Sequence, residues 1–286
     1  MGLFESALEG IVAIAQARMQ QEPGHEDDYI GEDGLLYCGM CKAPRQMVLE
    51  VPMVGTRIVP IMCPCEIAKR EAEAAREAME AEQRRIDGMR KIGITSPDYR
   101  EMVLAADDGS DPKMRAIVDR YIEKRDLMRR ENIGLLLHGS PGGGKTFWAS
   151  ALANAMIDHG NSAMITTVPR LVTAMKKDFE AEKPRILEQV ERVQFLVLDD
   201  VGVERNTGTT NEMVYEIIDA RYRSRRPLIV TTNLTLEEIK NPQKMEDKRV
   251  FDRIMEMCQP IYVYGEGRRK AISREKSNKA REILGI

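Results

Sequence analysis

Residues 139–146 have the residue types and spacing of a phosphate-binding loop. They read Gly-Ser-Pro-Gly-Gly-Gly-Lys-Thr, which fits the pattern G-x-x-x-x-G-K-[ST]. Glycine allows positive φ, so successive backbone N–H groups can turn toward phosphate oxygens. We expect Lys145 to reach the β- and γ-phosphates of a nucleotide, and the Thr146 hydroxyl to bind Mg²⁺. The predicted phosphate-binding residues are Gly139, Ser140, Pro141, Gly142, Gly143, Gly144, Lys145 and Thr146.

The segments on either side of this loop support the same interpretation. Residues 133–138 form an apolar run typical of a short buried strand, and residues 147–159 have the pattern of a helix. The N-terminus of that helix would face the phosphates with its partial positive charge. A glycine-rich turn could match the pattern by chance, but a strand before it and a helix after it favour a nucleotide site.

A second apolar run, residues 195–200, ends in two acids. In a protein with a phosphate-binding loop, such a strand supplies the carboxylate that binds the metal ion. Asp199 is expected to hold Mg²⁺ through water, and Asp200 to orient the attacking water. Glu204 is a second candidate for orienting the water, and the alternative interpretation of Glu204 is an exposed loop acid.

Two further segments carry polar groups suited to a nucleotide site. Residues 229–233 form another predicted strand, and Asn233 at its end can hydrogen-bond the γ-phosphate or the water. The predicted helix over residues 245–258 carries Arg249 and Arg253 four positions apart, hence on one face. One of these arginines could reach the γ-phosphate of a neighbouring subunit.

Four of the five cysteines lie in two close pairs, Cys-x-x-Cys and Cys-x-Cys. The segment between the pairs, residues 47–62, is rich in Val, Ile and Met and predicts a hairpin that brings the pairs together. Four thiolates in tetrahedral reach predict one structural Zn²⁺, with no open position for catalysis, and His25 is a possible substitute ligand. The predicted zinc ligands are Cys38, Cys41, Cys63 and Cys65.

Composition excludes several classes of protein. The 286 residues carry a net charge of −3, so a general polycation that coats nucleic acid is excluded, and any DNA contact must be local. There is no run of 18 apolar residues, so no membrane partner is expected. The first twenty residues lack a basic start, which argues against a signal peptide and for a cytoplasmic protein. We expect the fifth cysteine, Cys258, to lie in a helix and to pack there like an ordinary side chain.

The sequence predicts three segments. Residues 1–65 hold an amphipathic helix (1–21) and a small zinc-binding α+β domain, and residues 66–92 form a charged linker helix. Residues 93–286 form an α/β domain, because strand and helix patterns alternate from residue 132 onward. A helix is predicted before them over residues 111–130, and the last strand is predicted over residues 261–264. Its basic C-terminal tail is a candidate DNA contact, and a solvated end is the alternative.

Taken together, the phosphate-binding loop, the Asp-Asp-Val-Gly-Val-Glu and Thr-Thr-Asn-Leu runs, Arg-Val-Phe-Asp-Arg and the closing Gly-Glu-Gly-Arg-Arg resemble the DnaC/DnaI-type AAA+ helicase loaders, of which the IstB ATPases are close relatives. The resemblance implies an AAA+ P-loop NTPase, a three-layer sandwich whose parallel sheet has the order 5-1-4-3-2, and ATP bound between subunits. By motif, Arg253 is the expected arginine finger, with Arg249 beside it, and Arg269 or Arg268 is the expected sensor 2. Asp200 departs from the glutamate of many AAA+ enzymes.

What the resemblance implies about function is an ATPase that holds a hexameric replicative helicase and places it on single-stranded DNA. The zinc-bearing N-terminal domain would contact the helicase, and subunits would associate through the ATP site. Two alternatives stay open. One is an IstB-like ATPase that assists DNA transposition, and the other is a scaffold that binds nucleotide without hydrolysing it.

Overall fold

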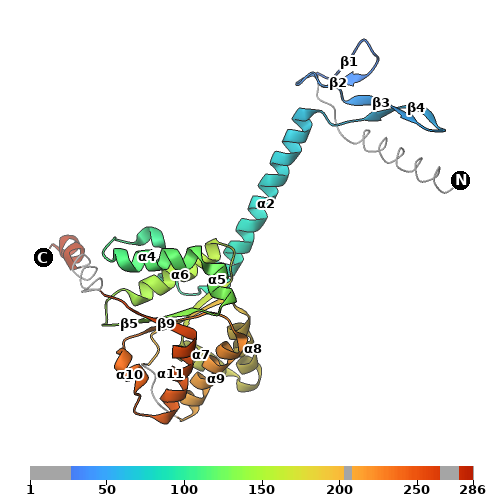
Figure 1. The fold of residues 1–286 in the computed structure, drawn as a ribbon. Coiled ribbons are helices and arrows are strands. Elements are labelled where there is room, and N and C mark those ends of the chain that lie inside the picture. Colours follow the sequence, from blue (N-terminus) through green and yellow to red (C-terminus); the bar gives the residue numbers. More distant parts are fainter. Residues whose placement is uncertain (1–26, 203–207, 265–276, 286) are drawn as a thin grey trace. The chain divides into compact units, whose positions relative to one another are not determined.

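The computed structural model describes residues 27–202, 208–264 and 277–285, and the chain divides into two compact units, residues 1–83 and 84–286 (Figure 1). The division falls inside one long helix, α2 (Pro64–Gly93). The helix predicted for residues 1–21 lies outside the described residues. Among the described residues, no helix is both long and apolar enough to cross a membrane.

The first unit is built from two small antiparallel sheets. Strands β1 (Tyr29–Ile30) and β2 (Leu36–Tyr37) form one, and β3 (Gln46–Val51) and β4 (Gly55–Pro60) form the other. The β3–β4 pair is the hairpin predicted between the cysteine pairs, with Val48 opposite Ile58 in register. The chain turns tightly between these strands, where Met53 and Gly55 both have positive φ.

Helix α2 begins between the two residues of the last cysteine pair and is exposed over most of its length. Ion pairs one turn apart support it, such as Glu66–Arg70 at 3.2 Å. Each exposed pair of this kind contributes only a few tenths of a kcal/mol, on the order of 0.3–0.5. The end of α2 belongs to the second unit, where Arg85 donates to the carbonyl of Gly160.

The second unit is a five-stranded parallel sheet in the order β6-β7-β8-β5-β9. If the strands are numbered 1 to 5 from β5 to β9 and the sheet is read from the β9 edge, the order is 5-1-4-3-2. This is the order that the family resemblance implied. The strands are β5 (Gly134–His138), β6 (Ala163–Thr167), β7 (Phe195–Asp199), β8 (Leu228–Thr232) and β9 (Cys258–Tyr262). The helices are α3 (Pro97–Glu101), η1 (Leu104–Ala106), α4 (Pro112–Glu123), α5 (Arg125–Arg130), α6 (Lys145–Asp158), α7 (Val168–Lys177), α8 (Phe179–Arg192), α9 (Gly208–Ser224), α10 (Leu236–Lys240) and α11 (Met245–Met257).

Helices cover both faces of this sheet, so the unit is a three-layer sandwich (Figure 1). Successive side chains of a strand point to opposite faces. In β5, Leu135 and Leu137 therefore join the core under α4 and α6, whereas Leu136 joins the core under α7, α8, α9 and α11. Burial on both faces explains why the strands read as continuous apolar runs rather than alternating ones.

Two boundaries differ from the sequence prediction. Cys258 does not lie in a helix: it is the first residue of β9, opposite Gly134 of β5, and its Sγ lies 3.2 Å from the carbonyl oxygen of Leu228. The last strand accordingly begins at Cys258 rather than at Ile261. Its Pro260 is compatible with a strand because β9 is at the sheet edge, where one side of the strand needs no ladder hydrogen bonds.

The predicted helix over residues 111–130 is also interrupted. It forms two helices, α4 and α5, that meet at Lys124, whose N–H still donates to the Arg120 carbonyl. The Asp111 side chain caps the start of α4 by accepting a hydrogen bond from the Met114 N–H. Pro112 fits in the first turn because the backbone N–H that proline lacks would have no partner within the helix there.

Candidate nucleotide and metal sites

The predicted phosphate-binding loop joins the end of β5 to the start of α6. Gly142 and Gly144 have φ of 87° and 93°, a region that favours glycine. A Cβ at Gly139, whose φ is 141°, would lie 2.8 Å from the Val263 carbonyl oxygen, so this position also needs glycine. The loop thus leads directly into the N-terminus of α6, where free N–H groups favour an anion.

Lys145 lies across this loop and is buried. Its Nζ donates to the carbonyl oxygens of Gly139 and Ser140, both at 2.9 Å. These two carbonyls hold the ammonium over the loop, within reach of phosphates bound there. Because a buried ammonium needs several hydrogen-bond acceptors, phosphate oxygens can replace the carbonyls as its partners.

Asp199, at the end of β7, is the centre of a hydroxyl cluster. Its Oδ1 accepts from Thr146 Oγ1 at 2.9 Å and from Thr231 Oγ1 at 2.6 Å, and its Oδ2 accepts from the Tyr99 hydroxyl at 3.1 Å. Thr146 and Asp199 are the two predicted Mg²⁺ ligands, and the fold brings them together. A carboxylate next to a hydroxyl at the phosphate end of the loop fits Mg²⁺, which prefers oxygen ligands.

Thr231 and Tyr99 were not predicted from the sequence. Thr231 could have been found, because it belongs to the polar end of the strand that carries Asn233. Tyr99 carries no sequence signal, since it lies in a short helix one hundred positions before Asp199. Burial, followed by the charge of Asp199, raises the pKa of Tyr99 well above its usual range, so its hydroxyl remains a donor.

Asp200 and Asn233 form a second pair beside this cluster. The Asn233 amide donates to Asp200 Oδ1 at 2.8 Å, and the Asp200 N–H donates to Thr231 Oγ1 at 2.8 Å. Asp200 has φ of 60°, which a non-glycine residue rarely adopts and which costs on the order of 1 kcal/mol. This backbone turns the exposed Asp200 carboxylate away from the buried Asp199 and toward Asn233.

The remaining predicted residues of the ATP site are not part of this cluster. Arg253 of α11 forms an ion pair with Asp219 of α9, and its guanidinium lies over the rings of Tyr215 and Tyr222 at 4.5 and 5.4 Å. Arg249 is exposed on the same helix. The alternative water-orienting acid, both sensor 2 candidates and the substitute zinc ligand lie outside the described residues: Glu204, Arg268, Arg269 and His25.

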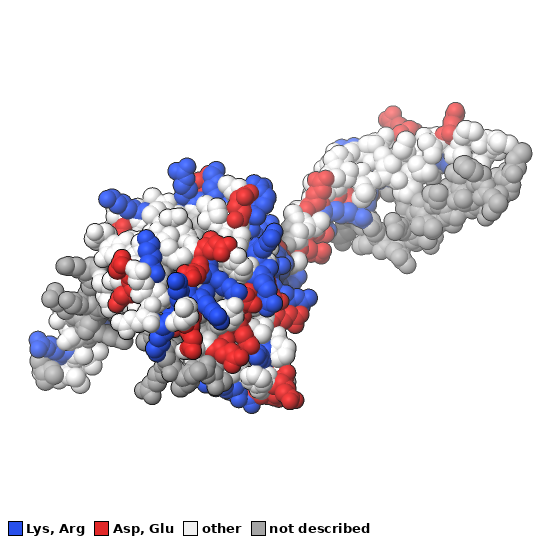
Figure 2. All heavy atoms as spheres, turned by 60° about the horizontal axis from the view of Figure 1, so that its bottom comes forward, with Lys and Arg blue, Asp and Glu red and all other residues white. Residues whose placement is uncertain are grey.

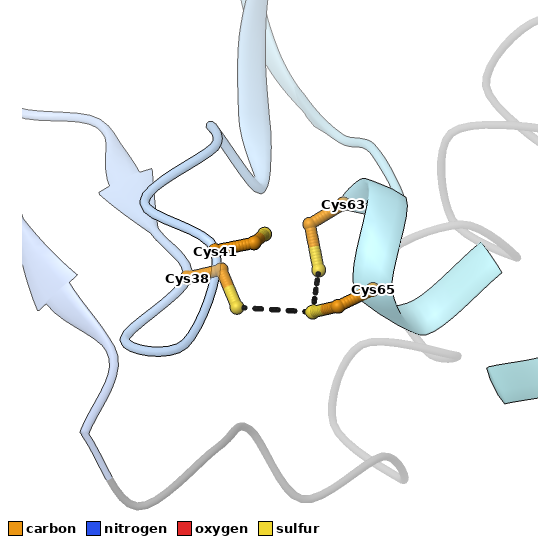
Figure 3. A group of neighbouring side chains, drawn as sticks. All are labelled: Cys38, Cys41, Cys63 and Cys65. Atoms are coloured by element: carbon orange, nitrogen blue, oxygen red, sulfur yellow. Dashed lines mark hydrogen bonds between the residues drawn. The ribbon is translucent and has the colours of Figure 1, made fainter. Parts of the chain in front are cut away.

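The four predicted zinc ligands converge in the first unit (Figure 3). Their Sγ atoms all lie within 4.8 Å of one another, and Cys65 Sγ is 3.4 Å from Cys38 Sγ and 3.2 Å from Cys63 Sγ. A tetrahedral ion with Zn–S distances of about 2.3 Å separates its sulfurs by about 3.8 Å. The donor set and its spacing therefore fit a structural Zn²⁺.

Local backbone structure positions these cysteines. After β2, the Cys38 N–H donates to the Ala43 carbonyl and the Lys42 N–H returns to the Cys38 carbonyl, which closes a tight knuckle. Cys63 and Cys65 flank the first residue of α2, and Cys63 accepts from two N–H groups of its first turn. Hydrogen bonding from the Ala43 N–H lowers the pKa of Cys41 to about 6, which favours the thiolate that a metal needs.

Comparison with known proteins places this arrangement in a family. The sequence model of the family described as "IstB-like ATP binding protein" matches residues 117–277, more than half of the chain. The chain belongs to this family. The match begins in α4 and includes the phosphate-binding loop, Asp199, Asp200, Asn233 and both arginines of α11.

Curated relatives of this chain include the replicative helicase loaders DnaC and DnaI. The chain is 32% identical over 139 residues to the replicative helicase loader DnaC of Escherichia coli (strain K12), which covers 47% of the chain and 54% of that protein. It is 29% identical over 147 residues to the replicative helicase loader DnaI of Bacillus subtilis (strain 168), covering 48% and 47%. The chain thus spans about half the length of the curated relatives it matches.

Two solved structures have a similar fold over about 60% of the chain. A crystal structure of the DnaC helicase loader matches with a TM-score of 0.50 at 26% identity, covering 59% of this chain and 99% of that one. The crystal structure of DnaI also has a TM-score of 0.50, at 24% identity, covering 60% and 95%. The AAA+ fold and the resemblance to DnaC and DnaI inferred from the motifs are both confirmed.

Proposed function

We propose that this chain is an ATP-dependent loader that places a hexameric replicative DNA helicase on single-stranded DNA in the cytoplasm. The observation that carries the proposal is a phosphate-binding loop with Lys145 across it, Thr146 bonded to Asp199 and Asn233 bonded to Asp200, in a chain similar to DnaC and DnaI. ATP hydrolysis, the helicase partner and the DNA contact are all part of the proposal.

At the ATP site, each residue has a distinct task. Lys145 exchanges the carbonyls of Gly139 and Ser140 for phosphate oxygens, and the N–H groups of the loop hold the same phosphates.

Thr146 and Asp199 hold Mg²⁺, which neutralises charge on the phosphates. Asp200 and Asn233 are close enough to position a water molecule together at the γ-phosphate.

The first unit supplies a candidate surface for the helicase. The β3–β4 hairpin exposes apolar side chains on both strands, with Val48 50% and Ile58 53% exposed. Exposed apolar side chains that cluster on a small unit mark a protein contact more often than isolated ones do. Further exposed apolar residues of the hairpin are Met47, Leu49 and Met53.

We further propose that DNA binding and self-association occur in the second unit. One face of the molecule carries basic and acidic side chains side by side rather than a uniform basic surface (Figure 2). This mixture agrees with the net charge of −3 and requires a local DNA contact. The basic tail over residues 268–281 stays a predicted contact, and Arg253 or Arg249 the predicted finger toward the next subunit's ATP.

The second candidate function is an ATPase that assists DNA transposition. It is favoured by the IstB-like family match over residues 117–277. That match begins after the cysteine cluster, which is the part of the chain that favours a loader. The two functions therefore share the ATP site and differ in the partner of the first unit.

A binding and loading experiment tests the proposal with the full chain. The chain is mixed with the hexameric replicative helicase of its own source, and the complex is measured by light scattering and by helicase loading onto circular single-stranded DNA with ATP. Val48→Thr combined with Ile58→Thr should weaken the complex at least tenfold while keeping β-branched side chains in the strands.

Ile92→Thr is the matched control, because Ile92 is 74% exposed but lies at the end of α2, in the second unit. It should bind the helicase like the parent. Absence of any complex between the parent chain and the helicase, together with ATP-dependent recruitment of a transposase to duplex DNA, would replace the loader function by the transposition function.

A further inference from the structure

We infer that Tyr99 is a positioning residue for Asp199, which ties the Mg²⁺ carboxylate to the segment that follows α2. This inference rests on the Mg²⁺–ATP binding part of the proposed function and adds a residue to it. The Tyr99 hydroxyl lies 3.1 Å from Asp199 Oδ2, on the oxygen that neither threonine contacts.

The three donors to Asp199 come from three different elements. Thr146 belongs to α6, Thr231 to β8 and Tyr99 to α3. Both threonines bind Oδ1, so without Tyr99 the torsion of the carboxylate about Cβ–Cγ would be held through one oxygen alone. Tyr99 supplies the missing constraint, and a phenol is a dependable donor at neutral pH.

The position of Tyr99 is itself determined by buried contacts with α6. Asn154, which is 1% exposed, donates from Nδ2 to the carbonyls of Tyr99 at 2.8 Å and of Met102 at 3.1 Å. Asn154 lies two turns after Thr146 on the same helix. One helix therefore presents a Mg²⁺ ligand at its start and orients the Tyr99 backbone from its middle.

The segment before Tyr99 is anchored as well. Gly93 ends α2 so close to β6 that a Cβ there would lie 1.8 Å from the Ala163 carbonyl oxygen. Ile94 is fully buried, and its carbonyl accepts from Arg100 at 2.6 Å. Residues 93–102 thus form a docked connection between the end of α2 and the metal site, and the Tyr99 hydroxyl is its contact with that site.

Groups that hydrogen-bond a metal ligand orient it, and their loss commonly lowers metal affinity by roughly 10–100-fold. Tyr99→Phe keeps the ring and removes only the hydroxyl. The variant should need about tenfold more Mg²⁺ for half-saturation of Mg²⁺-dependent ATP binding. Its affinity for ATP in excess EDTA should not change, because the Lys145 and loop contacts remain.

Tyr121→Phe is the matched control. It removes the same atom from another tyrosine of the second unit, whose hydroxyl donates to the Ile133 carbonyl at 2.7 Å rather than to Asp199. Binding can be read from the fluorescence of Trp148, the single tryptophan, which is buried in α6 two residues after Thr146. The unfolding temperature with ATP plus Mg²⁺ and with ATP plus EDTA gives a second readout.

A Mg²⁺ midpoint that rises in Tyr99→Phe and not in Tyr121→Phe supports the inference. Equal midpoints in Tyr99→Phe and the parent, or equal shifts in both variants, overturn it. If Tyr99→Phe unfolds, 3-fluorotyrosine at position 99, a stronger donor of nearly the same shape, should lower the midpoint, and no change would overturn the inference. A parent chain that binds no ATP would instead refute the proposed function.

Discussion

Asp199 and Asp200 are neighbours in the chain with opposite environments. Asp199 is buried and accepts three hydroxyl hydrogen bonds, whereas Asp200 is exposed, has positive φ and accepts from the Asn233 amide. The strand ends between them, so the first acid faces the phosphate-binding loop and the second faces β8. This difference allows two adjacent carboxylates to take separate tasks, metal binding and water positioning.

Asp200→Asn should therefore separate binding from hydrolysis. Its amide keeps the size of the side chain but cannot act as a base, so ATP binding should persist while turnover falls by about 100-fold or more. Binding is measured by Trp148 fluorescence and turnover by phosphate release. Glu237→Gln, on the exposed first turn of α10, is the control and should hydrolyse ATP like the parent. Full activity of Asp200→Asn would move the water-orienting task to Glu204.

His138 directly precedes the phosphate-binding loop, and we expect it to make the unfolding free energy depend on pH. Burial, followed by the charge of Lys145, lowers the pKa of His138 below its usual value. The unfolded chain therefore binds more protons than the folded chain just below about pH 6.5, so stability falls as the pH drops through this range. His138→Gln should reduce the loss of unfolding free energy between pH 7 and pH 5. Parallel pH profiles of the parent and the variant would contradict this.

At the scale of elements, helix α9 packs on the face of the sheet opposite α6 and contacts several elements there. It carries Arg221, which is fully buried and donates to the carbonyls of Val190, Val193 and Gln194 at 2.7–2.9 Å. These carbonyls belong to the end of α8 and the start of the turn into β7, so one guanidinium caps a helix and holds the turn before Asp199. Burial lowers the pKa of Arg221 to about 9, which leaves it charged at neutral pH.

Arg221→Lys should destabilise the second unit by about 3 kcal/mol. A lysine ammonium cannot reproduce the planar set of donors, so buried carbonyls lose their partners. Chemical denaturation followed by far-UV circular dichroism measures the change. Arg223→Lys is the control on the same helix: its side chain is 68% exposed, and its ion pair with Asp219 should contribute less than about 1 kcal/mol. Equal stability of both variants would show that the carbonyl contacts are unimportant.

The contact between α9 and α11 bears on the choice of arginine finger. Within one chain, Arg253 is held by Asp219 and by the rings of Tyr215 and Tyr222, whereas Arg249 is exposed. Arg253→Ala should lower the unfolding free energy by about 1–2 kcal/mol, since a guanidinium over aromatic rings and an ion pair are lost. Arg249→Ala should leave it unchanged.

The same two variants identify the finger when ATPase activity is measured on assembled protein. ATP binding by isolated chains should survive in both. If Arg253 is the finger, Arg253→Ala loses assembly and DNA-stimulated hydrolysis. Undiminished stimulated turnover in Arg253→Ala, with its loss in Arg249→Ala, would assign the role to Arg249.

At the scale of the molecule, the two units are stabilised by different means. The second unit has two extensive apolar cores, one on each face of its sheet. In the described part of the first unit, the fully buried apolar side chains are Cys38 and Cys63, which belong to the cysteine cluster. The apolar core within residues 27–83 is too small to offset the entropy of ordering these residues, and a metal can supply stability there.

Metal removal should therefore unfold the first unit selectively. Elemental analysis of freshly purified, reduced protein should find about one Zn²⁺ per chain, and a strong chelator should increase hydrogen exchange in β3 and β4. ATP binding by the second unit should persist. Cys258→Ser is the control, since Cys258 lies in β9 and not in the cluster, and it should keep its zinc. Zinc-free protein with a protected hairpin would refute the metal assignment.

Sequence by itself determined the features that depend on residues close together in the chain. The phosphate-binding loop is an example, because glycine spacing dictates the local backbone that Gly142 and Gly144 adopt. The cysteine pairs and their hairpin are another, since two strands joined by a short turn pair locally. The sheet order followed from the family resemblance, not from the local pattern.

Only the tertiary structure decided the contacts between remote residues. Tyr99 reaches Asp199, Asn154 reaches the Tyr99 backbone, and Arg253 pairs with Asp219. The end of α11 was also decided this way, because Cys258 pairs with β5 instead of continuing the helix. Local propensity cannot predict such contacts, since they are set by how helices pack on the sheet and by which buried polar groups must find partners there.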